Sequence, residues 1–179
     1  MVAAVQDNTN PHVLVTTYLE MASRVQFRPA YISGSHFSIQ RMKTPDVGFY
    51  RFLYGSVGEQ WRWRDRLVMP DDELQSILTN PGVTVDVLYV HGVPAGYVEL
   101  DRQDKETEIA YFGLRTAFHG LGYGKHLLSH GIAQAWSDGA QRVWVHTCNL
   151  DGPHALDNYI KRGFSIYHVD SKPLPPRYM

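Results

Sequence analysis

The chain has 179 residues, which is enough for one domain with a hydrophobic core. Hydrophobic residues make up 44% of it and charged residues 20%, the usual balance of a soluble globular protein. The net charge of −1 does not favour a nucleic-acid partner. The single cysteine, Cys148, excludes an intramolecular disulfide, and no apolar run approaches the length of a membrane span.

The first residues, 1–11, are predicted to be a loose leader, and they lack the basic and apolar regions of a signal peptide. We therefore expect a cytoplasmic location and no membrane partner. The charge is uneven further along, because residues 24–66 hold eight Lys and Arg residues against three Asp and Glu residues. Two interpretations stay open: a solvated basic face, or a pocket for a ligand that carries negative groups.

The N-terminal half gives few clear elements. Residues 13–27 start with a strand-like run of Val, Thr and Tyr, and residues 28–40 look irregular. The pattern Thr44-Pro45 predicts a helix start, with Thr44 as N-cap and Pro45 in the first turn. A second helix is predicted from about residue 70, where acidic residues suit a first turn, to about residue 80.

The C-terminal half gives a clear order of elements. Three strands separated by short turns predict an antiparallel meander, and a helix, a strand, a second helix and a last strand follow. The predicted ranges are 83–91, 95–102 and 107–114 for the meander, then 126–136, 142–147, 154–162 and 164–169. This order indicates an α+β fold with a crossover after the third meander strand.

The most informative stretch is residues 112–125, where a strand enters a turn with Gly120, Gly122 and Gly124 and then a helix. Glycines let backbone N–H groups approach an anion closely, and a helix N-terminus adds partial positive charge. The spacing does not fit a P-loop, which needs four residues between its first glycine and Gly-Lys, nor the G-x-G-x-x-G of a Rossmann turn. A phosphate or pyrophosphate cradle and a glycine turn without a ligand both remain open.

This stretch resembles the acetyl-CoA motif of the GNAT N-acetyltransferase superfamily, Q/R-x-x-G-x-G/A, with His119 at the Gln/Arg position. Residues 108–114 look like the bulged fourth strand of that family, and residues 155–164 resemble its A-x-x-x-Y-x-x-x-G-F element. The resemblance covers residues 83–169 well and residues 12–82 only in general layout. It implies a single GNAT-like domain over residues 12–179, with a mixed, mostly antiparallel, splayed sheet flanked by helices.

The resemblance also implies acetyl-CoA as acetyl donor and no metal. The residues expected to bind acetyl-CoA are Phe112, Gly113, Leu114, His119, Gly120, Leu121, Gly122, Tyr123, Gly124, Lys125 and Asn149. His119 replaces the usual Gln or Arg, which affects one side-chain contact and not the backbone cradle. Asn149 lies ten residues before Tyr159 instead of about seven, so whether it reaches the donor stays open.

Direct transfer to an amine poses two proton problems. An alkylammonium of pKa about 10.4 is neutral about once in 2,500 molecules at pH 7, a cost of about 4.6 kcal/mol. The resemblance makes Glu108 the candidate base, because some family members carry a catalytic Glu at this place on the strand. Glu99 on the preceding strand, acting through water, is the alternative, and a solvated or structurally paired role stays open for both. Tyr159 is the candidate donor of a proton to the leaving thiolate, and backbone N–H groups at 112–114 are expected to bind the acetyl carbonyl.

The acceptor is expected to be a small-molecule amine. Tyr54, Trp61, Arg62 and Trp63 are the candidate acceptor residues, through stacking and cation–π contacts, and core packing is the alternative. If Arg62 or Arg64 faces the cleft, the acceptor carries a carboxylate or phosphate. The sequence leaves open a homodimer, an alcohol acceptor, a longer acyl group and a non-catalytic acyl-CoA sensor.

Two other arrangements are disfavoured as sites. His126 and His130 have a spacing that can hold zinc, but no third ligand is evident, so we expect surface or capping roles. His146 and Cys148 share one face of a predicted strand, but direct transfer needs no thiol nucleophile.

Overall fold

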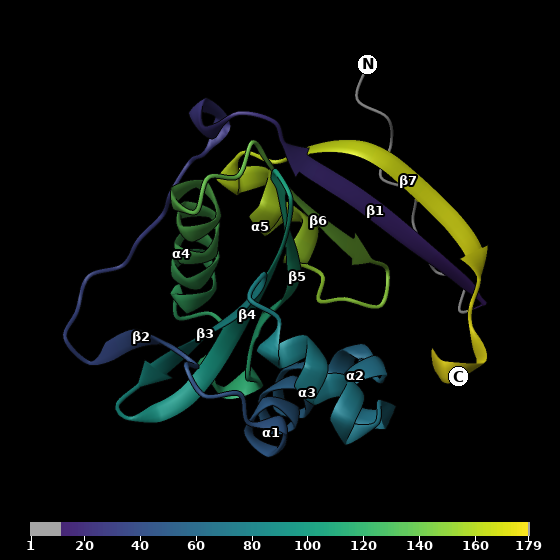
Figure 1. The fold of residues 1–179 in the computed structure, drawn as a ribbon. Coiled ribbons are helices and arrows are strands. Elements are labelled where there is room, and N and C mark those ends of the chain that lie inside the picture. Colours follow the sequence, from purple (N-terminus) through teal and green to yellow (C-terminus); the bar gives the residue numbers. More distant parts are fainter. Residues whose placement is uncertain (1–11, 179) are drawn as a thin grey trace.

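A computed structural model describes residues 12–178, so the predicted leader at residues 1–11 lies outside the described part. One seven-stranded sheet crosses the molecule in the order β2-β3-β4-β5-β6-β1-β7 (Figure 1). Neighbouring strands are antiparallel except β5 and β6, which are parallel, as the predicted crossover requires. The strands are β1 (Val13–Met21), β2 (Phe37–Arg41), β3 (Val83–Val90), β4 (Val93–Gln103), β5 (Glu106–Leu114), β6 (Arg142–Cys148) and β7 (Ser165–Pro173).

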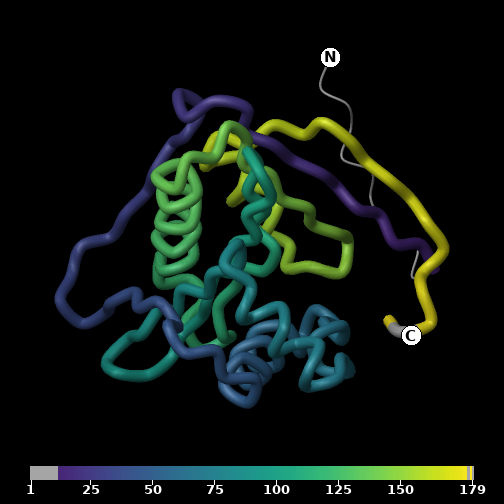
Figure 2. The backbone as a smooth tube through the Cα atoms, viewed as in Figure 1, coloured from purple at the N-terminus to yellow at the C-terminus, as the bar shows by residue number. Residues whose placement is uncertain are grey.

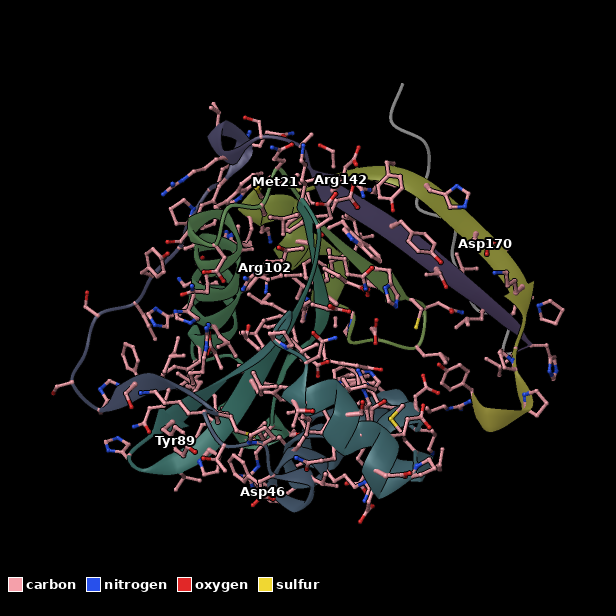
Figure 3. All side chains as sticks on the ribbon, in the orientation of Figure 1. Met21, Asp46, Tyr89, Arg102, Arg142 and Asp170 are labelled. Atoms are coloured by element: carbon pink, nitrogen blue, oxygen red, sulfur yellow. The ribbon has the colours of Figure 1, made fainter. Side chains whose placement is uncertain are left out.

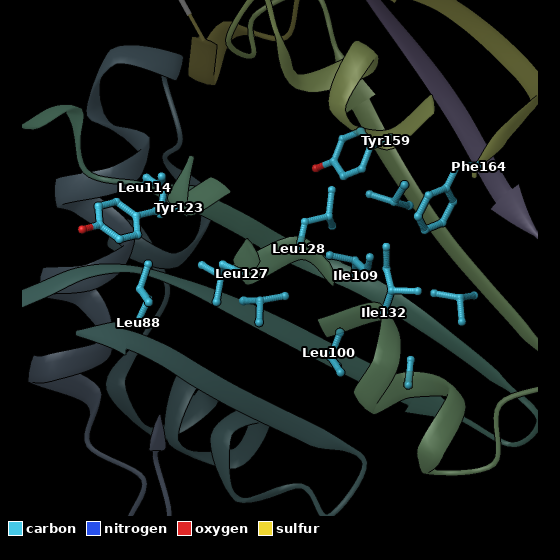
Figure 4. Close-up of a cluster of buried hydrophobic side chains, with 14 of the residues drawn as sticks. Leu88, Leu100, Ile109, Leu114, Tyr123, Leu127, Leu128, Ile132, Tyr159 and Phe164 are labelled. Atoms are coloured by element: carbon cyan, nitrogen blue, oxygen red, sulfur yellow. The ribbon is translucent and has the colours of Figure 1, made fainter. Parts of the chain in front are cut away.

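Helices cover both faces of the central strands. Within the described residues, the α-helices are α1 (Val47–Gly58), α2 (Asp65–Val68), α3 (Asp71–Thr79), α4 (Tyr123–Ser137) and α5 (Ala155–Arg162). Side chains along β3, β4 and β5 alternate between the two faces of the sheet and contribute to two separate cores. One lies under α4 and includes Leu100, Ile109 and Leu128 (Figure 4), and the other lies under α1 and α3 and includes Val87 and Tyr97.

The sheet splits between β5 and β6. These two strands pair only at their first residues, from Glu106↔Arg142 to Glu108↔Trp144, and β5 then pairs with β4 alone. Arg142 holds the closed end, because its guanidinium donates to Glu20 on β1 at 2.6 Å and to Glu106 on β5 at 2.8 Å (Figure 3). Beyond this point the two strands diverge, which is the splayed sheet that the resemblance implies.

A bulge in β5 lies at the start of the open part. The partners change from Leu100↔Ile109 to Glu99↔Tyr111, so Ala110 is the extra residue. The insertion reverses the alternation, and Tyr111 therefore joins the core under α1 while Phe112 packs on the α4 side. The bulge thus directs a tyrosine ring to the side of the sheet on which Glu108 lies.

The strand β1 lies between β6 and β7, far in sequence from both. Asn149 extends the pairing, because its side-chain amide accepts from Val15 N and donates to Val13 O, at 2.9 and 2.8 Å. After β1 the chain runs along the outside of α4 before it reaches β2 (Figure 2). This passage is held by bonds from Ala30 N to Ser129 Oγ and from Ile32 N to His126 Nδ1, at 2.9 and 3.3 Å.

Two local predictions in the N-terminal half are wrong. Helix α1 is capped by Asp46, whose carboxylate accepts from Phe49 N at 2.7 Å, and not by Thr44 (Figure 3). Residues 28–40 are not wholly irregular, because β2 begins at Phe37, where pairing with β3 supplies an order that its sequence alone does not indicate. No helix within residues 12–178 combines the length and the apolar character that crossing a membrane requires.

Candidate active site

The glycine turn connects the open end of β5 to α4. Gly120 and Gly122 have φ angles of 75° and 85°, in the left-handed region that favours glycine. Within the described part, the amides of Gly120, Leu121 and Gly122 donate to no protein acceptor, whereas the preceding amides of Phe118 and His119 do. Together with the first N–H groups of α4, they form a row of donors at a positive helix end.

Space over this row is available for a ligand. A Cβ built on Gly120 would meet no atom within 4 Å, and one on Gly124 would meet only Leu114 and Asn158, at 3.7 and 3.9 Å. Glycine at these two places is therefore not required by protein packing, although the φ of Gly120 favours it. The donors and the space fit a phosphate or pyrophosphate group.

The side chain of His119 makes a contact within the turn. Its Nε2 lies 2.9 Å from Leu114 O, so a protonated Nε2 closes the turn onto the last residue of β5. The imidazole therefore holds the glycine turn against the end of β5. Asn149 is also engaged elsewhere, because β1 takes up both ends of its side-chain amide.

Tyr159 projects from α5 toward the split in the sheet. Its ring packs on Phe112 and Phe164, at centroid distances of 6.2 and 6.0 Å. Its hydroxyl is on the side of the ring away from Phe164 (Figure 4) and has no hydrogen-bond partner among the described residues. Burial, together with the charge of Asp151, raises the pKa of Tyr159, so it carries its proton at neutral pH.

The two candidate bases have different surroundings. Glu99 is 1% exposed, accepts a hydrogen bond from the Tyr50 hydroxyl, and pairs with Arg66 at 3.1 Å. Burial raises the pKa of Glu99, and Arg66 and Tyr50 oppose that rise. Glu108 lies at the split, with its Oε1 3.2 Å from His146 Nδ1. Glu108 is therefore the base candidate that borders open space, and Glu99 is part of a buried ion pair.

A cavity of about 260 Å³ lies on the side of the sheet covered by α1, next to the split. Three of the four expected acceptor residues line it: Tyr54, Trp61 and Trp63. The other lining residues are Asp65, Arg66, Asp101, Glu108, Ala110, Tyr111, His146, Cys148, Leu150, Asp151 and Tyr178. The structure thus brings the expected base and the expected aromatic residues together in one cavity.

Arg62 does not line the cavity. It takes up a left-handed backbone conformation, with φ 58°, and its guanidinium donates to Tyr178 O at 2.8 Å. Arg66 lines the cavity instead, and sequence reasoning missed it. The three-residue spacing between Trp63 and Arg66 would place both side chains on one face of a helix, and this was the available signal. The signal is weak, because α2 begins only at Asp65, after Trp63.

The two histidines that could have held zinc have structural partners instead. His126 accepts from Ile32 N, and His130 bonds to Asp86 at 2.9 Å. No cluster of three possible metal ligands is found among residues 12–178. Cys148 and His146 do share a face, as expected, but burial raises the pKa of the Cys148 thiol to about 11, which keeps it protonated.

Comparisons with known proteins agree with this geometry. A family model described as acetyltransferase (GNAT) family matches residues 50–164. A search of curated proteins gives no match. Among solved structures, a GCN5-related N-acetyltransferase from Sphaerobacter thermophilus is similar, with a TM-score of 0.63 and 18% identity over 92% of this chain and 53% of that one.

Two further structures are similar in fold. An aminoglycoside acetyltransferase from an uncultured soil metagenomic sample, in complex with trehalose, has a TM-score of 0.60 and 19% identity, over 71% of this chain and 87% of that one. A functionally unknown conserved protein from Staphylococcus epidermidis has a TM-score of 0.58 and 16% identity, over 89% of this chain and 60% of that one. The chain therefore spans little more than half the length of the Staphylococcus and Sphaerobacter proteins.

Proposed function

We propose that this chain, which belongs to the acetyltransferase (GNAT) family, transfers an acetyl group from acetyl-CoA to an amine on a small molecule. The observation that carries the proposal is the glycine turn beside the split in the sheet. The turn offers unpartnered amides for the pyrophosphate, and the split offers the free edge of β5 for the extended pantetheine arm. An aminoglycoside acetyltransferase among the similar folds agrees with a small amine as acceptor.

Glu108 takes the proton of the attacking amine in this proposal. The amine enters from the cavity that Glu108 lines, and its nitrogen forms a bond to the acetyl carbon. Because an alkylammonium costs about 4.6 kcal/mol to deprotonate at pH 7, a carboxylate at the point of attack offsets part of the barrier. His146 hydrogen-bonds to Glu108 and is exposed enough to pass the proton to water.

Tyr159 supplies the proton that the leaving sulfur needs. As the bond between acetyl carbon and sulfur breaks, the thiolate of CoA accepts a proton from the Tyr159 hydroxyl, for which no described residue competes as a hydrogen-bond partner. The backbone amides of β5 from Phe112 to Leu114 are the candidate donors to the carbonyl oxygen, since β5 has no β6 partner there. No observation favours the non-catalytic sensor over the enzyme.

The test separates binding from turnover. Calorimetry of the protein with acetyl-CoA should show one site per chain, and acetyl-CoA should raise the melting temperature. Release of CoA thiol should then appear on addition of a mixture of small amines. Absence of both heat and a melting shift at millimolar acetyl-CoA contradicts the whole proposal, and binding without thiol release under any amine favours the sensor.

A further inference from the structure

The cavity beside the split is rich in carboxylates. Asp101, Glu108 and Asp151 line it, each half-buried, and no Lys or Arg of the described residues forms an ion pair with any of them. Among the lining side chains that the structure describes, Arg66 is the only Lys or Arg, and its charge is offset by Glu99 at 3.1 Å. The other basic residues of segment 24–66 do not line the cavity, so the local excess of positive charge lies elsewhere.

Asp151 is held in a fixed orientation by neutral donors only. Its Oδ2 accepts from Thr147 Oγ1 at 2.7 Å and from Cys148 N at 2.9 Å, and its Oδ1 lies 3.3 Å from Trp63 Nε1. These donors orient the carboxylate without cancelling its charge. A fixed anion at the wall of a cavity favours a cation within the cavity, because little further ordering is needed when the cation binds.

Aromatic rings form an independent feature of the same wall. The rings of Tyr54, Trp63 and Tyr111 contact one another in pairs, with centroids 5.1 to 5.4 Å apart, and Trp61 lines the cavity beside them. The guanidinium of Arg66 already lies 5.3 Å from the Tyr111 centroid. Aromatic faces attract ammonium groups, and the attraction grows when the group is desolvated.

We propose that the acceptor of this site is a polyamine or another amine with at least two ammonium groups. One nitrogen reacts at Glu108, and a second, still charged, is attracted by both Asp101 and Asp151 and by the rings. This inference rests on the proposed function, since it assigns the cavity to the acceptor. It replaces the expectation of an acceptor with a carboxylate or phosphate, because Asp101, Glu108 and Asp151 would repel such a group.

The test uses binding to the whole chain without acetyl-CoA, by calorimetry at low salt. The probes are spermidine, n-butylamine and β-alanine, which carry three, one and one ammonium groups, the last with a carboxylate. Spermidine should bind at least tenfold more tightly than n-butylamine, β-alanine should not bind detectably, and salt should weaken spermidine binding. Asp101→Asn and Asp151→Asn should each weaken it about tenfold.

Asp72→Asn is the matched control, because it removes one exposed carboxylate from the first turn of α3, outside the cavity. Equal loss of affinity in this control, or β-alanine binding as well as spermidine does, overturns the inference. If Asp151→Asn does not fold, Asp101→Asn decides the matter alone. Thiol release with acetyl-CoA is measured separately. If spermidine binding depends on Asp101 and Asp151 but no thiol is released, the proposed function is contradicted. If thiol is released with monoamines alone, only this inference is contradicted.

Discussion

Glu108 and His146 meet where β5 and β6 separate, with Oε1 of Glu108 3.2 Å from Nδ1 of His146. Glu108 is the last β5 residue that pairs with β6, opposite Trp144, and His146 lies two residues further along β6 on the same face. The side chain of Glu108 is 18% exposed and that of His146 is 46% exposed. The pair therefore connects a sheltered carboxylate to a solvent-facing imidazole.

Replacement of Glu108 by Gln should lower kcat about 100-fold, because the amide cannot accept the proton of the amine. The plot of activity against pH should also lose its acidic limb. Steady-state thiol release measures both. Glu106→Gln is the control, since Glu106 lies two residues earlier on the same strand and pairs with Arg142. Equal rates in the two variants would assign the base elsewhere.

Replacement of Tyr159 by Phe should lower kcat about tenfold or more and leave the KM for acetyl-CoA nearly unchanged, because it removes a proton used only in the transition state. Stability should change little, since the hydroxyl has no partner in the described part and the ring contacts with Phe112 and Phe164 remain. Thermal unfolding is the accompanying measurement. If the variant keeps full kcat, Tyr159 is not the proton donor and water protonates the thiolate.

The C-terminal half of the fold was predictable because its order comes from local patterns. Each strand of the meander and each helix after it carries its own periodicity, and the structure places them within a few residues of the predicted ranges. The position of β1 was not predictable. Its partner strands lie more than 120 residues away, and the residue pattern of β1 does not indicate which strands it pairs with. Long-range pairing is decided by packing rather than by local sequence.

The acceptor side of the site was predictable only in part. Aromatic residues at 54, 61 and 63 suggested a ligand pocket, and the structure places all three in one cavity. The carboxylates Asp101, Glu108 and Asp151 of that cavity come from β4, β5 and a loop, so counting charges along residues 24–66 does not reveal them. Asp101 and Asp151 are 50 residues apart in the chain, and only the fold brings both to one wall.

Replacement of Gly124 by Val should weaken acetyl-CoA binding at least tenfold, because the side chain would fill the space over the turn. A Cβ at Gly124 would make only ordinary contacts with the protein, so we expect folding to be retained. Gly48→Val is the matched control, since Gly48 is likewise the second residue of a helix and its Cβ would meet only Asp46, at 3.5 Å. Calorimetry on both variants measures the effect. Equal affinities for acetyl-CoA would show that this turn does not bind the pyrophosphate.

Replacement of Asp86 by Asn should lower stability at pH 7 by about 2 kcal/mol. Burial by itself would raise the pKa of Asp86, but hydrogen bonds from His130 and Arg41 outweigh it and lower the pKa to about 2. Because the folded pKa lies below the usual 3.8, this stabilisation is present above pH 4 and is lost as pH falls toward 2. Urea unfolding of both proteins should show their difference shrinking below pH 4. A constant difference down to pH 2.5 would assign the effect to packing.

Replacement of Glu99 by Gln should act on stability more than on catalysis. The amide still accepts from Tyr50, but it leaves Arg66, whose side chain is only 12% exposed, without its counter-charge. The free energy of unfolding should therefore fall by about 3 kcal/mol, and kcat should fall only a few-fold once folding is complete. Urea unfolding and saturating kinetics on the same preparation separate the two effects.

The double variant Glu99→Gln/Arg66→Met is the control for this assignment, because it removes both charges of the buried pair. It should recover part of the lost stability, since Met fills the space of the Arg side chain without an unpaired charge. If Glu99→Gln instead lowers kcat as much as Glu108→Gln does while stability holds, then Glu99, acting through water, is the base. In that case the contact between Glu108 and His146 would stabilise β5 and β6 where their pairing ends, and it would not transfer a proton.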